Sequence, residues 1–67
     1  MTLGQTIRAA RRAAGLSQME LGLRCGFEGR SAEVTVQNWE HDRNLPTILV
    51  IRALAEALNI PLDQLIP

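Results

Sequence analysis

Residues 17–40 read SQMELGLRCGFEGRSAEVTVQNWE, and this stretch decides the fold. Ser17 is a good helix N-cap, because its side-chain oxygen can accept a hydrogen bond from a backbone N–H group of the first turn. The apolar residues Leu21 and Cys25 follow at helical spacing, and Gly26 then suits a turn that needs positive φ. The pattern therefore predicts a helix that starts after Ser17 and ends near Cys25.

A further helix is expected in the second half of this stretch. The glycine and serine within residues 27–31 favour a loop, so the helix is expected to begin near Ala32. Val36 and Trp39 lie three residues apart and therefore share one face of that helix. Residues 42–46 are typical of a turn that ends it.

The segment before this stretch predicts a first helix. Thr2 can cap its start, and Gly15 is placed just beyond its last turn, where glycine commonly ends a helix. Its apolar residues recur at helical spacing and are Leu3, Ile7, Ala10 and Ala14.

The segment after it predicts a fourth helix and a short fifth one. Pro46 and Thr47 open the fourth helix, and Asn59 can close it in the left-handed conformation. Residues 61–66 fit the fifth helix, in which Leu62 and Leu65 would close the core. The apolar stripe of the fourth helix comprises Ile48, Ile51, Leu54, Ala55 and Leu58. The chain is thus expected to be one all-α domain over residues 1–67, a compact bundle of five short helices.

Length and composition restrict the class of protein. A chain of 67 residues makes one domain, and its 46% of hydrophobic residues supply the core. No apolar run approaches the roughly 20 residues of a membrane span. Residues 1–16 carry three arginines without the hydrophobic stretch of a signal peptide. We therefore expect a soluble, cytoplasmic protein that does not bind membranes.

The sequence contains no set of residues that predicts catalysis, a cofactor or a metal site. One cysteine cannot form an internal disulfide, and Cys25 with His41 supplies too few ligands for zinc. Cys25 falls at an apolar helical position, where a buried and inert thiol is expected. No serine, cysteine or pair of carboxylates has a plausible set of catalytic partners. The chain is therefore expected to be non-enzymatic and to carry no cofactor.

The distribution of charge is more informative than the net charge, which is zero. All seven basic residues are arginine, and Arg8, Arg11 and Arg12 lie in the first helix with no acidic residue among them. The planar fork of arginine suits phosphate groups and guanine edges. The three arginines therefore indicate a nucleic-acid surface or, alternatively, an ordinary solvated helix face.

Several motifs follow one another in a distinctive order along the chain. They are GLSQ (15–18), Leu21, Gly22, Gly26, VQNWE (36–40), Pro46 and LNIPLDQL (58–65). This order resembles the helix-turn-helix family of the phage lambda repressor and Cro type, and the resemblance covers almost the whole chain. It implies a lambda-repressor-like bundle in which Gly22 allows the second and third helices to approach closely.

The same resemblance implies a function. Members of this family are sequence-specific DNA-binding transcriptional regulators, so we expect a repressor of bacterial or phage origin that acts at the nucleoid. The expected partner is double-stranded DNA, bound at a palindromic operator by a homodimer.

The resemblance also assigns DNA-binding roles to individual residues. The helix near residues 32–41 would enter the major groove, with Glu33, Val34 and Asn38 facing base edges. Asparagine can pair with adenine, valine can touch a thymine methyl group, and glutamate can accept from cytosine N4. The helix dipole alone would also favour a carboxylate at the position of Glu33. The residues expected to contact the DNA backbone are Gln18, Thr35, Gln37, Arg43 and Asn44.

An ion pair is expected within the bundle. Arg11 and Glu40 stand where the family often pairs the first helix with the end of the third. Such a pair would be structural, and it would keep Arg11 from acting as a DNA ligand.

The chain departs from the family pattern at the turn. The family usually has six residue steps from the turn glycine to the apolar residue that matches Val36, whereas here Gly26 to Val36 spans ten (36 − 26 = 10). Four extra residues are therefore expected to lengthen the turn around residues 28–31. Arg30 would then reach a phosphate or a neighbouring groove, or else belong to a mobile surface loop.

Surplus apolar residues of the fourth helix indicate a partner interface, although scattered residues of this kind are also tolerated on surfaces. A second interpretation is a protein-interaction module, such as an antitoxin that binds a toxin. A third is the DNA-binding part of a longer repressor with a sensing or oligomerisation domain. The residues expected at a homodimer interface are Leu49, Val50, Ala53, Leu62 and Ile66.

Overall fold

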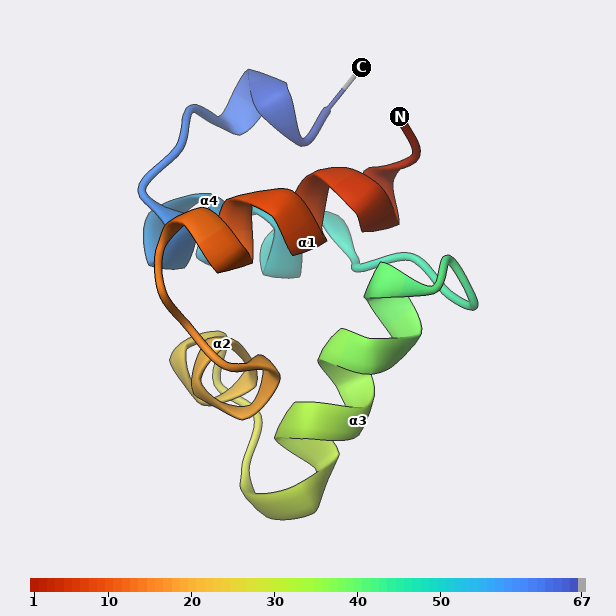
Figure 1. Ribbon diagram of the computed structural model, residues 1–67, viewed down its shortest axis with the longest axis vertical. Helices are drawn as coiled ribbons and strands as arrows, with labels where there is room; N and C mark the ends of the chain where they lie inside the picture. Colours follow the sequence, from red (N-terminus) through yellow and green to blue (C-terminus); the bar gives the residue numbers. More distant parts are fainter. Residues whose placement is uncertain (67) are drawn as a thin grey trace.

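The chain forms four α-helices and one turn of 3₁₀ helix. In the computed structural model, which describes residues 1–66, they are α1 (Leu3–Ala13), α2 (Gln18–Arg24), α3 (Gly29–Glu40), α4 (Ile48–Leu58) and the 3₁₀ turn η1 (Leu62–Gln64). Figure 1 shows α2 and α3 in the lower half of the molecule, with α1 and α4 above them and the C-terminal segment at the top. The all-α fold expected from the sequence is confirmed over these residues.

Three of the helices begin at hydroxyl residues that cap them. The caps are Thr2 for α1, Ser17 for α2 and Thr47 for α4, and each side chain accepts a hydrogen bond from a backbone N–H group of the first turn. In α1 and α2 the third helical residue, Gln5 or Glu20, accepts in return from the N–H group of the cap. The helix starts expected at these three positions are confirmed.

Each α-helix is followed by a residue with a left-handed backbone. The value of φ is 74° at Gly15, 97° at Gly26, 56° at Asp42 and 55° at Asn59. The N–H group of the next residue then donates to the carbonyl group five residues earlier, and this bond satisfies a carbonyl that the helix leaves unpaired. The ends expected at the two glycines and at Asn59 are confirmed, whereas Asp42 was not foreseen in this role.

Asp42 also ties the end of α3 to the start of α1. One carboxylate oxygen accepts from the Thr2 hydroxyl at 2.7 Å, and the other accepts from the backbone N–H of Gly4 at 3.0 Å. Aspartate is among the residues that tolerate positive φ best. The absence of a side chain at Gly4 is required here, because a Cβ atom would overlap the backbone of Trp39. The two helix termini are therefore in direct contact.

The four extra residues lengthen α3 instead of the turn, so the expected long turn and the expected start near Ala32 are wrong. α3 begins at Gly29, and only residues 25–28 separate it from α2. Four residues are close to the 3.6 residues of one helical turn. They therefore add a turn to the start of α3 while Val36 and Trp39 still face the core.

This added turn is held mainly by packing. Gly29 has a φ of 57°, and the hydroxyl of Ser31 donates to the carbonyl of Glu28 at 2.7 Å. Unlike the other three helices, α3 has no side-chain hydrogen bond from its N-cap. Ala32 is fully buried against α2, and this burial would be lost if the residues before it formed a loop.

α2 and α3 approach most closely at Gly22. A Cβ atom at this position would overlap the backbone of Ala32, so only glycine fits. The neighbouring Leu21 is fully buried in the same contact region. The close approach expected from the sequence is confirmed, although the residue opposite Gly22 lies in the turn that this chain adds.

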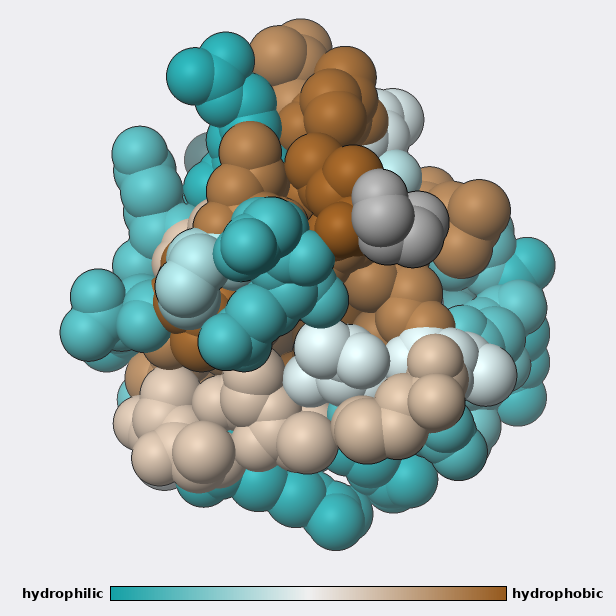
Figure 2. All heavy atoms as spheres, turned by 90° about the horizontal axis from the view of Figure 1, so that it is seen from above, coloured by the Kyte–Doolittle hydropathy of each residue, from teal (hydrophilic) through white to brown (hydrophobic). Residues whose placement is uncertain are grey.

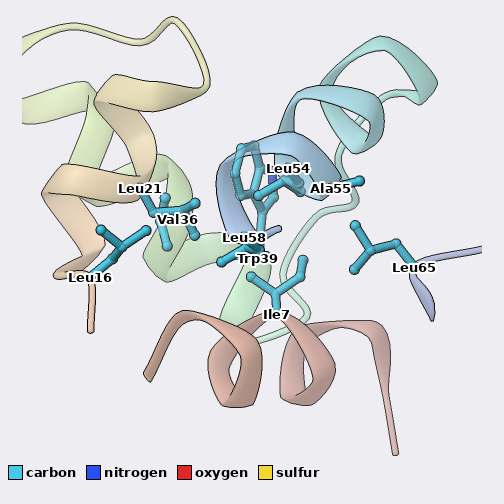
Figure 3. Close-up of a cluster of buried hydrophobic side chains, with 9 residues drawn as sticks. All are labelled: Ile7, Leu16, Leu21, Val36, Trp39, Leu54, Ala55, Leu58 and Leu65. Carbon is cyan, nitrogen blue, oxygen red and sulfur yellow. The ribbon is translucent and has the colours of Figure 1, made fainter. Parts of the chain in front are cut away.

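Trp39 lies at the centre of the core. Figure 3 shows it among the side chains of α1 and α4, with the side chains contributed by α2 and its preceding loop to one side. Phe27, from the turn before α3, packs edge-on against it, with ring centroids 5.7 Å apart and planes inclined at 69°. The buried cluster comprises Ile7, Leu16, Leu21, Val36, Trp39, Leu54, Ala55, Leu58 and Leu65.

Three apolar residues expected in the core lie outside it. Ile48 is 60% exposed. It is the first residue of α4, and the apolar face that is buried at Leu54 is not covered at this end of the helix. Ala14 is exposed because it follows the last residue of α1. Leu62 is also exposed, since the expected fifth helix is a single 3₁₀ turn, whereas Leu65 is buried as expected.

We expect Gly22→Ala to lower the free energy of unfolding by about 1–3 kcal/mol, because the added methyl group forces α2 and α3 apart. Urea unfolding followed by the fluorescence of Trp39 measures this change. Arg24→Ala, at an exposed position of the same helix, is the control and should change stability by less than about 0.5 kcal/mol. Equal stability of Gly22→Ala and the wild type would contradict the close approach of the two helices.

Candidate nucleic-acid interface

The carboxylate of Glu40, the last residue of α3, holds that helix against α1 and α2. Its side chain is only 1% exposed. Oε2 accepts from Arg11 Nε at 2.6 Å, and Oε1 accepts from Arg11 Nη2 and Gln18 Nε2, both at 3.2 Å. Arg8 Nε lies 3.7 Å from Oε1. A buried carboxylate requires such partners, because its charge is otherwise poorly solvated.

Arg11 is part of this support. The structure brings it to Glu40, as the resemblance implied, and its side chain is 11% exposed. Its remaining terminal nitrogen, Nη1, donates to the carbonyl of Leu16 at 2.9 Å. The approach of Arg8 to the same carboxylate was not expected from the sequence. The spacing of three residues between Arg8 and Arg11, which places both on one face of α1, was the available signal.

Gln18 links α2 to α3 through its bond to Glu40. The start of α2 is also occupied by the capping box, in which the Ser17 N–H donates to Glu20 Oε1 at 2.9 Å. This backbone hydrogen bond lowers the pKa of Glu20, so its carboxylate is ionised at neutral pH. Because Gln18 donates only one of its two amide hydrogens to Glu40, its side chain is the group at this helix start that keeps a donor for a DNA phosphate.

α3 presents an outward face on the side opposite the core. Arg30, Val34 and Asn38 follow one another at four-residue spacing and therefore share this face, with Gln37 beside them. Arg30 is exposed, Val34 is 42% exposed, and Gln37 and Asn38 are partly buried. Figure 1 shows the first turn of α3 at the end of the molecule that lies away from both termini. We refer to Arg30, Val34, Gln37 and Asn38 as the outward face of α3.

Glu33 and Thr35 lie on the two flanks of this face. Both are partly buried. At 100° per residue, Glu33 is closer to the core position of Val36 than Val34 is. The structure thus places Glu33 beside the outward face and not at its middle.

Arg43 and Asn44 follow α3 in an exposed loop. Arg43 Nη1 donates to the side-chain oxygen of Asn38 at 3.4 Å. Two residues that the sequence assigned separately to DNA contact are therefore neighbours, and a guanidinium group lies beside the amide of Asn38.

The residues expected at a dimer interface differ in their exposure. Leu49 is 74% exposed, whereas Val50, Ala53 and Ile66 are partly buried. Figure 2, viewed from above, shows apolar side chains gathered over α4 and the C-terminal segment. Leu45 and Ile48, near the start of α4, are also exposed apolar residues, which was not expected from the sequence.

Cys25 is partly buried, and this burial raises the pKa of its thiol to about 11. The thiol is therefore protonated at neutral pH and poorly nucleophilic, which agrees with a packing role. Residues 1–66 contain no group of three or more His, Cys, Asp or Glu side chains that could hold a metal ion. None of the helices in that range has the length and apolar character needed to cross a membrane.

We expect Arg11→Ala and Glu40→Ala each to lower the free energy of unfolding by about 3–5 kcal/mol, because each leaves the other charge buried without its partner. The double variant should lose less unfolding free energy than the sum of the losses of the two single variants. Urea unfolding of all three variants gives the coupling energy. If Glu40→Ala does not fold, Glu40→Gln takes its place in the double-mutant cycle with Arg11→Ala. The glutamine keeps a hydrogen-bond acceptor without the charge and is expected to destabilise the fold less. Strict additivity in the cycle would contradict the pairing.

The arrangement of helices agrees with a known family. A family model described as helix-turn-helix matches residues 7–65, a range that includes α2, α3 and α4 in full. No curated protein and no solved structure matches the chain significantly. The chain belongs to the helix-turn-helix family of the lambda repressor and Cro type, whose members are DNA-binding regulatory domains.

Proposed function

We propose that this domain is a sequence-specific transcriptional repressor that binds double-stranded DNA as a homodimer, with α3 in the major groove. The observation that carries the proposal is the outward face of α3, which presents the exposed Arg30 and Val34 and the partly exposed amides of Gln37 and Asn38, while the opposite side of the helix is fixed to α1 and α2. The major groove is wide enough to admit an α-helix. Family membership supports DNA binding independently of this geometry.

The outward face can contact bases directly. The amide of Asn38 can pair with adenine through N6 and N7, and Val34 can touch a thymine methyl group. An amide oxygen has two lone pairs. The oxygen of Asn38 can therefore accept from Arg43 and from adenine together, and Arg43 would fix the orientation of the amide.

Contacts to the DNA backbone are proposed around this face. Gln18 and Asn44 lie at the start of α2 and after the end of α3, Thr35 lies on a flank of α3, and Gln37 lies at the edge of the outward face itself. Such contacts set the position of the protein on the duplex without reading its sequence. Because the proposed backbone contacts come from more than one segment of the chain, they would hold α3 in one orientation relative to the duplex.

Asn38→Ala should cost about 1–3 kcal/mol of binding free energy at one base position and relax the preference there. Gln18→Ala should weaken binding to all sequences by a similar factor, because a backbone contact carries no sequence information. A selection of bound sequences from random DNA, followed by affinities on the selected site and its single-base variants, separates the two effects.

Two controls accompany this experiment. Glu56→Ala, at an exposed position of α4, should leave both affinity and preference unchanged. The stability of Gln18→Ala is measured as well, because the substitution removes the bond to Glu40. If Asn38→Ala retains the affinity and the preferred sequence of the wild type, α3 is not the reading helix.

A homodimer is proposed because one copy of α3 reads only a few base pairs. With a net charge of zero the domain gains little from general attraction to DNA. A single module would bind near the non-specific range of about 10⁻⁴–10⁻⁶ M. Two copies related by a two-fold axis would place their α3 helices about 34 Å apart, on half-sites centred about 10 base pairs apart.

The apolar surface over α4 and the C-terminal segment is the proposed contact between the copies. Its most exposed member is Leu49, and the adjacent Leu45 and Ile48 enlarge the surface that the sequence indicated. The other proposed members are the partly buried Val50 and Ala53 of α4 and, in the C-terminal segment, the exposed Leu62 and the partly buried Ile66. Apolar exposure of this kind commonly marks an interface.

Leu49→Asp should raise the dissociation constant of the dimer at least about tenfold, because it places a charge in an apolar contact. The fold should persist, since Leu49 is mostly exposed in the single chain. Analytical ultracentrifugation measures the dimer, and footprinting shows whether both half-sites of the operator are covered. Ala9→Asp, which adds the same charge at an exposed position of α1, is the control. A wild-type footprint over one half-site with one protein per duplex would contradict the dimer.

A further inference from the structure

Arg30 lies in the turn that this chain adds to the start of α3. It is exposed and precedes Val34 by four residues, so both side chains leave the same side of the helix. The sequence placed Arg30 in a loop, where its direction would be undefined. In the structure it is instead the first member of the outward face of α3.

The guanidinium group of Arg30 is available for a ligand. Over residues 1–66 the ion pairs are those of Arg8 and Arg11 with Glu40, and Arg30 takes no part in them. It also makes no side-chain hydrogen bond within this range. Arg43, in contrast, already donates to Asn38.

From this placement we infer that Arg30 reads a guanine in the major groove, at a base pair beyond those that Val34 and Asn38 contact. The inference rests on the proposed function of α3. A rise of 1.5 Å per residue places Arg30 about 6 Å beyond Val34 along the helix, which is close to two base-pair steps of 3.4 Å. The arginine fork matches O6 and N7 of guanine, the commonest specific contact in this groove.

The position of Arg30 favours a base over a phosphate. The N-terminal residues of a recognition helix contact base edges in the major groove. Arg30 shares the outward face with Val34, and the carboxylate-bearing residues Glu28 and Glu33 flank it in sequence. Their negative charges oppose a close approach of this turn to a phosphate, whereas guanine is neutral and needs only the two donors.

The added turn therefore enlarges the half-site. A helix that began near Ala32 would end its contacts at Val34, about one turn short of Arg30. With the added turn, each half-site gains about two base pairs, one of which is specified by guanine.

The inference is tested with Arg30→Ala, Arg30→Lys and the wild type, each used to select sequences from random DNA. The wild type should prefer guanine at one position flanking the bases read by Asn38, and Arg30→Ala should lose this preference alone. The affinity of Arg30→Ala for the wild-type site should fall about 5- to 150-fold. Arg30→Lys should lose most of the preference as well, because lysine has the charge without the fork.

Replacing the guanine by 7-deazaguanine, which lacks N7, provides a direct check. This replacement should lower the affinity of the wild type for the site and leave the affinity of Arg30→Ala unchanged. Arg52→Ala, at an exposed position of α4, controls for the loss of one positive charge and should keep the preferred sequence. Because Arg30 and Arg52 are both exposed, thermal unfolding should show the same stability for their variants as for the wild type.

The outcomes separate the inference from the proposed function. If the wild type selects no sequence, the proposed function fails and the inference fails with it. If Arg30→Ala selects the same sequence as the wild type, the inference alone fails. A uniform loss of affinity that Arg30→Lys restores would assign Arg30 to a phosphate and would also overturn the inference.

Discussion

The buried carboxylate of Glu40 determines how α3 is held on the rest of the domain. Apolar contacts around Trp39 keep the helix against the bundle, but such contacts have little directional preference. The hydrogen bonds from Arg11 and Gln18 are directional, and they connect the last turn of α3 to the last turn of α1 and the start of α2. One buried side chain thus orients the helix whose opposite side is exposed. A second fixed point lies near the other end of α3, where Gly22 lets the backbones touch.

The sequence predicts those parts of the fold that depend on neighbouring residues. Hydroxyl caps and left-handed residues act within one turn of a helix, so the starts of α1, α2 and α4 and the ends marked by Gly15, Gly26 and Asn59 could be read directly. The contact between Arg11 and Glu40 joins residues far apart in the chain. No local rule identifies it, and it was foreseen only from the resemblance to a family.

The start of α3 could not be predicted because local and tertiary preferences disagree there. Gly29 and Ser31 favour a loop, whereas burial of Ala32 against α2 favours a helix, and burial depends on a partner that the local sequence does not reveal. This error placed Arg30 in a loop. Likewise, the helical period shows which side of α4 is apolar but not where the neighbouring helices end, so the exposure of Ile48 was missed.

The contact of Asp42 with Thr2 and Gly4 affects the entropy of any complex that α3 forms. It orders the residue that follows α3 before a ligand arrives, by joining it to the first turn of α1. Immobilising a flexible side chain on binding costs about 0.5–1.5 kcal/mol, and groups that are already ordered do not incur this cost again. In a complex of α3 the loss of freedom would then fall largely on exposed side chains such as Arg30, because the end of the helix is already joined to α1.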